Sequence, residues 1–302
     1  MRALPPYSGS SLPWCDAAHE FHEEVEGVIR QKQAKIGNDG VALDAAHAVA
    51  FHTGLGNPLY PTPETPVGSY LNEHNVAAFA EAAYTKANIA VVADGASQGG
   101  LEKWLEPFFK KVPAQSEGKL STDAAKYHGG ESRIARNGIN SVVIAFPGTA
   151  LGASSPETAV LIGLLGGEST VKWSPGFSVL SKITAANPGA QVKAANYAYS
   201  DCGLFTVQVT GSGSAVRKAT QETVKALQSI AEGKVGKEDV VKAIAKAKFN
   251  LLSASETSGT GLVHAGASLI GGVKPLQVAE VLKSLESVTA DKLTAVCFHC
   301  IT

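Results

Sequence analysis

The feature that most constrains the fold is an internal repeat. A long helix pattern, an Ala- and Gly-rich helix pattern, a Gly/Pro loop and another helix pattern occur in residues 16–84, and the same order returns in residues 237–285. His47 and His264 stand at equivalent points in the two copies, 217 residues apart. A repeat at this spacing predicts two domains of the same type. The first copy then corresponds to the back portion of a domain, so we expect the first domain to be incomplete and the chain to be truncated at both ends.

A polar joint separates the two copies. Residues 115–123 are polar and lack an apolar period, whereas residues 141–146 form an apolar run of strand length. A turn-rich stretch before a buried strand is typical of a domain boundary. The sequence therefore predicts a first domain over residues 1–118, the C-terminal part of its fold, and a second over residues 119–302, which lacks its last strand.

Apolar spacing and turn residues predict the individual elements. Residues 191–199 and 204–210 alternate on either side of Ser200–Gly203, which is a hairpin signal. Strands are also expected at 142–146 and, as an all-apolar run, at Ile89–Ala93. Helices are expected at 16–36, 41–52, 71–84, 101–111, 157–165, 177–186, 214–231, 237–253, 261–270 and 275–285, with another beginning at 289–293.

Composition excludes several classes of protein. The 302 residues are 44% hydrophobic and 18% charged, with a formal net charge of −1, so no basic face of the kind that binds nucleic acid is expected. Four cysteines are too few for a disulfide framework. The longest uncharged run, 137–156, is interrupted by prolines and glycines and is no membrane span. Membrane association would have to come through a partner.

Three segments carry a family resemblance: Ala125–Glu131, Ala198–Phe205 and Tyr84–Ala90. They are similar to the pitrilysin-like metallopeptidase family and, within it, to the non-catalytic core proteins of mitochondrial ubiquinol–cytochrome c reductase, respiratory complex III. The resemblance covers about residues 16–294. It implies an α+β fold of two homologous domains, each a mixed or antiparallel sheet with helices packed mainly on one face.

The resemblance also implies a function. Such a protein is a structural subunit that supports respiratory electron transport without catalysis of its own and binds no cofactor. It would pair with a second core protein on the matrix side of the mitochondrial inner membrane and contact cytochrome b and other subunits of the complex. The alternative is a subunit of a mitochondrial processing peptidase, a zinc endopeptidase of the same family.

The zinc alternative depends on histidines in the first predicted helix. His19 and His22 are three residues apart, whereas the zinc motif H-x-x-E-H places its histidines four apart with a Glu base between them. Two imidazoles also need a third ligand. The resemblance would place that ligand, a Glu, on this helix, but around Gln31 and Lys32 no Glu stands in the expected place. We expect a solvated helix face here and no zinc.

Other chemical motifs have ordinary structural interpretations. Cys297–Cys300 has C-x-x-C spacing but no second pair. Gly163–Gly167 ends a helix and is too short for a substrate-holding loop. Ser200–Asp201 with His264 lacks a nucleophile elbow, and Gly211–Gly213 lacks the G-K-[ST] of a phosphate loop. The sequence therefore predicts no catalytic, cofactor-binding or metal-binding residues.

Overall fold

The computed structural model describes residues 21–58, 72–110, 112–114, 124–151, 155–167, 176–256, 258–270, 272 and 277–301. Contacts divide the chain into two compact units. The first unit combines residues 1–35 and 60–122, and the second combines residues 36–59 and 123–302. Residues 36–59 thus group with the second unit, although the sequence boundary assigned them to the first domain. The domain limits themselves stay a prediction.

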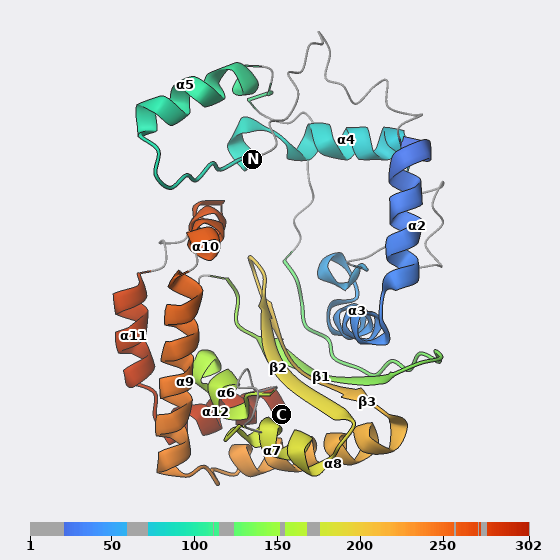
Figure 1. The fold of residues 1–302 in the computed structure, drawn as a ribbon, viewed down its shortest axis with the longest axis vertical. Helices are drawn as coiled ribbons and strands as arrows, with labels where there is room; N and C mark the ends of the chain where they lie inside the picture. The colour runs from blue at the N-terminus through green and yellow to red at the C-terminus, as the bar shows by residue number, and fades with distance from the viewer. Residues whose placement is uncertain are drawn as a thin grey trace. The chain divides into compact units, whose positions relative to one another are not determined.

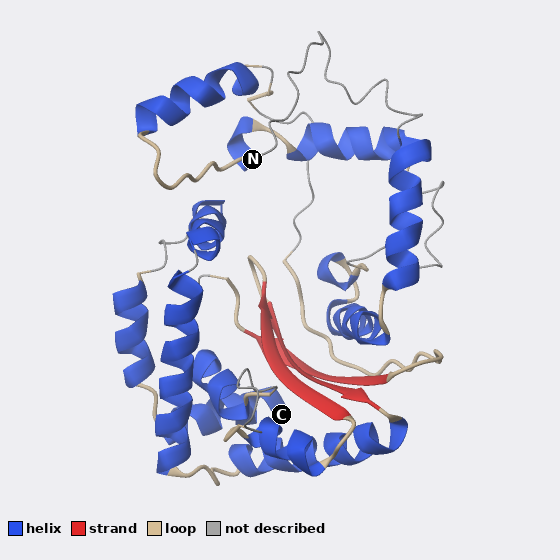
Figure 2. Cartoon of the chain, viewed as in Figure 1, coloured by secondary structure: helices blue, strands red, loops and turns tan. Residues whose placement is uncertain are grey.

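The second unit is built on a three-stranded antiparallel sheet (Figure 2). Its strand order is β1-β3-β2. Its strands are β1 (Asn140–Gly148), β2 (Ala190–Ala198) and β3 (Gly203–Gly211). β2 and β3 form the predicted hairpin, whose last pair is Ala198 and Gly203. β1 pairs with the other edge of β3, from Asn140 opposite Gly211 to Gly148 opposite Gly203. β3 is therefore the central strand of the sheet.

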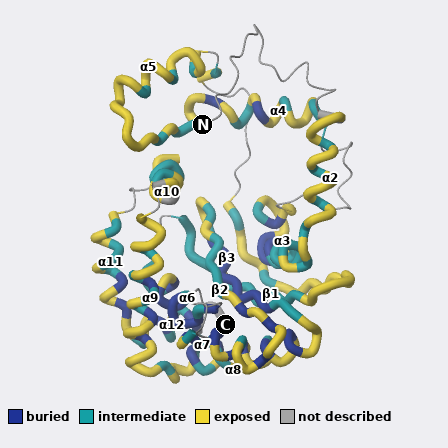
Figure 3. The backbone as a smooth tube through the Cα atoms, viewed as in Figure 1, coloured by how far each residue is buried: buried dark blue, intermediate teal, exposed yellow. Residues whose placement is uncertain are grey.

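A layer of helices covers one face of this sheet (Figure 1). Phe205, Val207 and Val209 of β3 point into that layer and are at most 2% exposed. Full burial of an apolar side chain of this size is worth about 1.5–3 kcal/mol, so this layer supplies most of the core (Figure 3). The layer comprises α6 (Pro156–Leu165), α7 (Val179–Ala186), α8 (Gly213–Ala231), α9 (Lys237–Glu256), α11 (Val278–Glu286) and α12 (Ala290–Ile301).

Two further helices of this unit lie outside that layer (Figure 1). α3 (Asn38–Phe51) packs on the opposite face of the sheet, and the short 3-10 turn Gly54–Gly56 follows it. α10 (Ser258–Ile270) continues from the end of α9. The predicted α+β class is confirmed, with helices mainly on one face. Among the described residues, no helix is long and apolar enough to cross a membrane.

The first unit is helical where the structure describes it. It contains a π-type turn (Phe21–Val25), α2 (Glu26–Lys35), α4 (Glu73–Ala83), a 3-10 turn (Lys86–Asn88) and α5 (Gln98–Phe109). The prediction of a strand at Ile89–Ala93 is wrong, because these residues belong to no strand. A strand needs a neighbour for its backbone hydrogen bonds, and the described residues of this unit supply none.

The apolar side chains of the first unit remain largely uncovered. Phe79, Val91, Trp104 and Phe108 are 60%, 41%, 66% and 62% exposed. Residues 16–20, 71 and 275–276, where three of the predicted helices were expected to begin, lie outside the described residues.

Candidate functional site

The sheet has a second, more polar face, and α3 lies on it. Successive side chains of a strand point to opposite faces, so Leu204, Thr206 and Gln208 of β3 point away from the main helix layer. They are 0%, 2% and 3% exposed. Leu204 packs with Ala50 and Phe51 of α3. The interface between α3 and the sheet therefore buries polar side chains, which makes it the first place to look for function.

His47 is the central polar residue of this interface, at 1% exposure. Its Nδ1 lies 2.9 Å from the Leu43 carbonyl oxygen one turn earlier in α3, and its Nε2 lies 2.7 Å from the hydroxyl oxygen of Tyr199. A carbonyl only accepts, so Nδ1 carries the proton and Nε2 accepts from Tyr199. The ring also meets Tyr197 and Tyr199 edge-on, with centroids 5.7 and 5.8 Å away. Both ring nitrogens are occupied.

The β2–β3 turn supplies the partners of this network. Burial raises the pKa of Tyr199 above its ordinary value, with smaller contributions from Tyr197, Cys202 and Asp44, so the tyrosine stays a neutral donor. The Asp201 carboxylate accepts a hydrogen bond from the Ala125 amide at 2.6 Å. Burial, and then Asp201, raise the pKa of the Cys202 thiol. A thiol with a raised pKa is a poor nucleophile, so the turn has no activated group.

The N-terminal end of α3 is held by amide side chains. Gln208 Nε2 donates to the Asp39 carbonyl oxygen at 2.8 Å and to Ser141 Oγ at 3.2 Å. Asn38 Nδ2 donates to the carbonyl oxygens of Asn137 and Ile139, at 3.1 and 2.8 Å. The N-terminal end of α3 is thus tied to β3 and to the segment that leads into β1.

The segment that leads into β1 closes one side of the interface. The His128 amide donates to the Ala50 carbonyl oxygen at 2.8 Å, and the Tyr127 hydroxyl lies 3.3 Å from the Ala145 carbonyl oxygen. Gly130 has φ 145°, and a Cβ there would lie 2.9 Å from Val49 Cγ1. This position therefore favours glycine, because a side chain would be strained and would press on α3.

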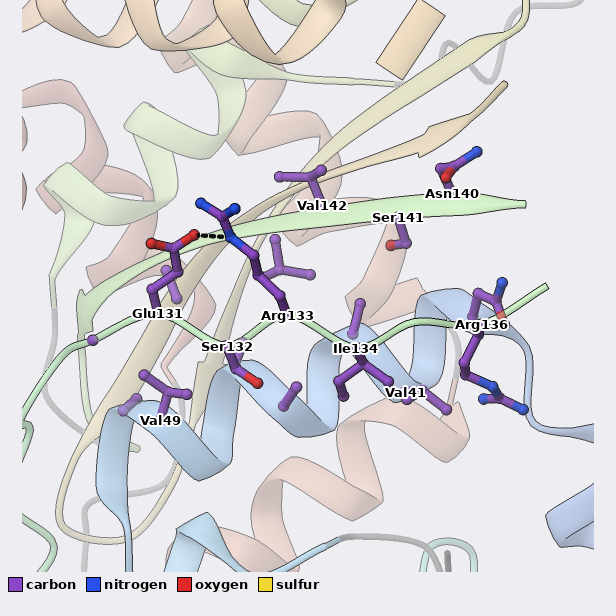
Figure 4. A pocket seen from close by; sticks show the side chains of 18 of the residues that line it. Val41, Val49, Glu131, Ser132, Arg133, Ile134, Arg136, Asn140, Ser141 and Val142 are labelled. Carbon is purple, nitrogen blue, oxygen red and sulfur yellow. Dashed lines mark hydrogen bonds and ion pairs between the residues drawn. The ribbon is translucent and has the colours of Figure 1, made fainter. Parts of the chain in front are cut away.

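A cavity of about 470 Å³ remains between α3, β1 and this segment (Figure 4). Its walls mix aliphatic side chains of α3, such as Val41 and Val49, with polar groups of residues 131–141. Glu131 and Arg133 pair across its rim at 2.6 Å, but both side chains are exposed, so the pair contributes little to stability.

The zinc-like histidines lie mostly outside the description. His19 and the side chain of His22 are not among the described groups. Gln31 and Lys32 both lie in α2 and are exposed. Among the described residues, no three His, Cys, Asp or Glu side chains are placed to hold a metal ion.

Packing and the end of a helix explain the cysteine and glycine motifs of the sequence. Cys297 is 2% exposed in the core, with its Sγ 3.5 Å from the Leu227 carbonyl oxygen, and the side chain of Cys300 lies outside the description. Gly163 touches the α9 backbone, and Gly166 has φ 66° where α6 ends. Gly211 has φ 149°, and a Cβ there would lie 2.0 Å from the Gly189 carbonyl oxygen, so backbone packing explains it.

The structure does not unite Ser200–Asp201 with His264. Asp201 is bound to the Ala125 amide, whereas His264 is exposed on α10. No hydrogen bond joins the two motifs in the part of the chain that the structure describes. Sequence reasoning also missed the α3 interface. Its signal was a histidine within an Ala-rich helix, together with polar residues at the alternate positions 206, 208 and 210 of a strand whose intervening residues are apolar.

The comparison with family models decides the ancestry. The model of the peptidase M16 inactive domain matches residues 70–247. The chain belongs to the peptidase M16 family. The resemblance drawn from three short segments is therefore confirmed. The matched model describes the inactive type of M16 domain.

Curated relatives and a solved structure are similar to this M16 chain over most of its length. It is 69% identical over 277 residues to the mitochondrial cytochrome b-c1 complex subunit 2 of Neurospora crassa, covering 92% of this chain and 61% of that protein. The subunit of the same name from Cryptococcus neoformans is 40% identical, with 86% and 60% covered. A chain of complex III2 from Candida albicans matches the fold with a TM-score of 0.72 at 14% identity, covering 94% of this chain and 70% of that one. The chain spans about three-fifths of the length of these two relatives.

Proposed function

We propose that this chain belongs to core protein 2, subunit 2 of the cytochrome b-c1 complex, which is mitochondrial ubiquinol–cytochrome c reductase or respiratory complex III. Its role is structural: it supports respiratory electron transport and catalyses no reaction itself. The observation that carries the proposal is the 69% identity over 277 residues to the Neurospora subunit of that name. Identity at this level over nearly the whole chain preserves the fold together with its surface.

The geometry of the α3 interface supports a structural role. His47, Tyr199, Asp201 and Gln208 are each bound to groups of a neighbouring element. Polar side chains that are already hydrogen-bonded within the fold specify how elements dock and are not free to act on a substrate. The raised pKa of Cys202 points the same way, because it disfavours the reactive thiolate.

The partners follow from the same proposal. Core protein 2 pairs with core protein 1, and the pair contacts cytochrome b and the other subunits of complex III. The protein lies on the matrix side of the mitochondrial inner membrane and is held at the membrane through these partners. No nucleic-acid partner is proposed, because a net charge of −1 gives no electrostatic attraction to the phosphate backbone.

The competing candidate is a subunit of a mitochondrial processing peptidase, a zinc endopeptidase that cleaves presequences. The match to the inactive M16 domain favours the structural role over this alternative. Catalytic zinc of this type needs three protein ligands and an open position for water. We expect well under one zinc per chain after dialysis against a mild chelator, and no cleavage of presequence peptides.

Affinity purification tests the proposal directly. A tagged copy of the full-length subunit, expressed in the organism that it comes from, should purify with cytochrome b and with a second M16 protein. Cytochrome b is detected by its haem absorbance. Purification as a soluble heterodimer that holds one zinc and cuts presequences would refute the structural role. The same preparation carrying Tyr199→Phe should still contain cytochrome b, because the hydroxyl serves folding and not partner recognition.

A further inference from the structure

β1 is an edge strand of the sheet, and the edge that faces away from β3 is open. The Tyr199 amide donates to the Cys202 carbonyl oxygen at 2.8 Å, and this pair fixes the alternation of hydrogen-bonded pairs across the sheet. By that alternation the even-numbered residues of β1 bond to β3, and the backbone groups of its odd-numbered residues point outward. Among the described residues, no backbone hydrogen bond reaches the outward groups of Ser141 or Val143.

This open edge lines the cavity between α3, β1 and the segment that leads into β1 (Figure 4). Residues 131–136 run beside β1 across the cavity, and in the described structure no backbone hydrogen bond joins them to it. The outward carbonyl oxygen of Ala145 accepts from the Tyr127 hydroxyl at one end of the edge. An open strand edge beside a cavity is a site at which an extended segment can add as a further strand.

A strand added to this edge would have apolar neighbours on both of its faces. α3 covers β1 on one face, and α8 and α12 contact β1 on the other. Val142 and Phe146 pack against the main helix layer but are only partly buried, so a neighbouring strand could cover them further. Strands that are buried on both faces are continuous apolar runs. The edge therefore favours a short, uncharged apolar segment.

Residues 89–93, with the sequence Ile-Ala-Val-Val-Ala, have these properties. They carry no charge, and they belong to no strand in the structure. Ile89 has extended backbone angles, with φ −110° and ψ 124°, and Val91 is 41% exposed. The segment has five residues, as has the edge from 141 to 145, and each spans about 13 Å at about 3.3 Å per residue. Length, polarity and backbone conformation thus match the open edge.

We propose that residues 89–93 of one copy of this chain add as a fourth strand to the β1 edge of a second copy. A single chain leaves both surfaces unused, since its described sheet has three strands and residues 89–93 belong to none. The contact joins two unlike surfaces, so a dimer keeps one open segment and one open edge, and association continues unless a ring closes. The inference concerns the 302-residue chain and does not depend on the proposed function.

Two proline variants test the inference, in a background of Trp104→Ser and Phe108→Ser that removes two exposed aromatic rings. Val143→Pro removes an outward amide of the edge and no hydrogen bond to β3, and proline is tolerated at such positions of edge strands. Val91→Pro removes an amide from the segment that is added. Sedimentation velocity should show concentration-dependent oligomers for the background chain and monomers for each variant alone.

Mixing the two variants separates strand addition from general aggregation. Val143→Pro keeps an intact segment and Val91→Pro keeps an intact edge, so the mixture should form a 1:1 heterodimer and no larger species. A monomeric background chain, variants that assemble as it does, or a mixture that stays monomeric would overturn the inference.

A peptide of residues 86–94 provides a readout that does not depend on the folding of Val143→Pro. The fluorescently labelled peptide should bind to the Val91→Pro chain and protect the amides of Ser141 and Val143 from hydrogen exchange. The matched control peptide carries Val91→Pro and should bind roughly tenfold more weakly, because main-chain hydrogen bonds supply much of the affinity in strand addition. Equal binding of the two peptides, or no protection of those two amides, would contradict the inference.

Discussion

Replacement of Gly163 by alanine should destabilise the second unit, against the usual trend for a helix. Glycine in the middle of a helix ordinarily costs about 0.5–1 kcal/mol relative to alanine. Here α6 lies against α9 so closely that a Cβ at Gly163 would be 2.6 Å from the Ala243 carbonyl oxygen and 3.6 Å from its Cα. Ala243 itself is fully buried, so the neighbouring backbone has no room to retreat.

The magnitude follows from two opposing terms. Inserting one methyl group into a well-packed core costs about 1–3 kcal/mol, and the gain in helix propensity offsets about 0.5–1 kcal/mol of that. The net loss for Gly163→Ala should be about 0.5–2 kcal/mol. For a unit of this size, each kcal/mol lowers the melting temperature by about 2–4 °C.

Pulse proteolysis across a urea gradient measures this loss, since it reads the folded fraction without an optical signal from every unit. Gly261→Ala is the matched control: it lies within α10, and a Cβ there would meet nothing within 4 Å. The control should leave the urea midpoint unchanged or raise it, and Gly163→Ala should lower it. A midpoint for Gly163→Ala that equals or exceeds that of the control would refute the argument that α6 and α9 meet backbone to backbone.

Three further predictions concern single groups. Tyr199→Phe leaves the Nε2 of His47 buried without a partner, so the free energy of unfolding should fall by about 1–3 kcal/mol in the same assay, and an unchanged midpoint would contradict the network. Because burial and Asp201 raise the pKa of Cys202 above its usual 9.0, iodoacetamide should alkylate Cys202 at pH 8 more slowly than it alkylates glutathione. Asp201→Asn should accelerate the alkylation of Cys202. An alkylation rate equal to that of glutathione in the unsubstituted chain would contradict the raised pKa. The isolated chain should bind a hydrophobic dye and elute as aggregates, with dye fluorescence lowered by Trp104→Ser; a monodisperse monomer that melts cooperatively would contradict the exposed apolar surface.

The local elements were predictable because their signals are local. Alternating residues on either side of Ser200–Gly203 specify a hairpin, and the structure pairs Ala198 with Gly203 as that signal requires. The amphipathic period of residues 214–231 gives α8 almost to the residue. The error at Ile89–Ala93 has the opposite cause: an apolar run is compatible with a strand, but only a neighbouring strand makes it one.

The candidate site was not predictable in the same way. His47 and Tyr199 are 152 residues apart, and the local sequence around either residue does not indicate that the two are in contact. α3 is rich in alanine, so its sequence allows close packing on almost any surface without selecting one. The polar positions Thr206 and Gln208 did signal that β3 has two unlike faces, but they did not indicate which helix covers the second.

The sequence by itself determined the types of most elements and the M16 ancestry, because these depend on local periods and on the order of segments along the chain. Only the tertiary structure decided that residues 36–59 belong with the second unit and that α3 covers its sheet. The physical reason is that docking depends on how well two surfaces, formed by residues far apart in the sequence, fit each other. Burial of Leu204 against Phe51, and a tyrosine hydroxyl opposite a buried imidazole, select one arrangement from several that the local pattern allows equally.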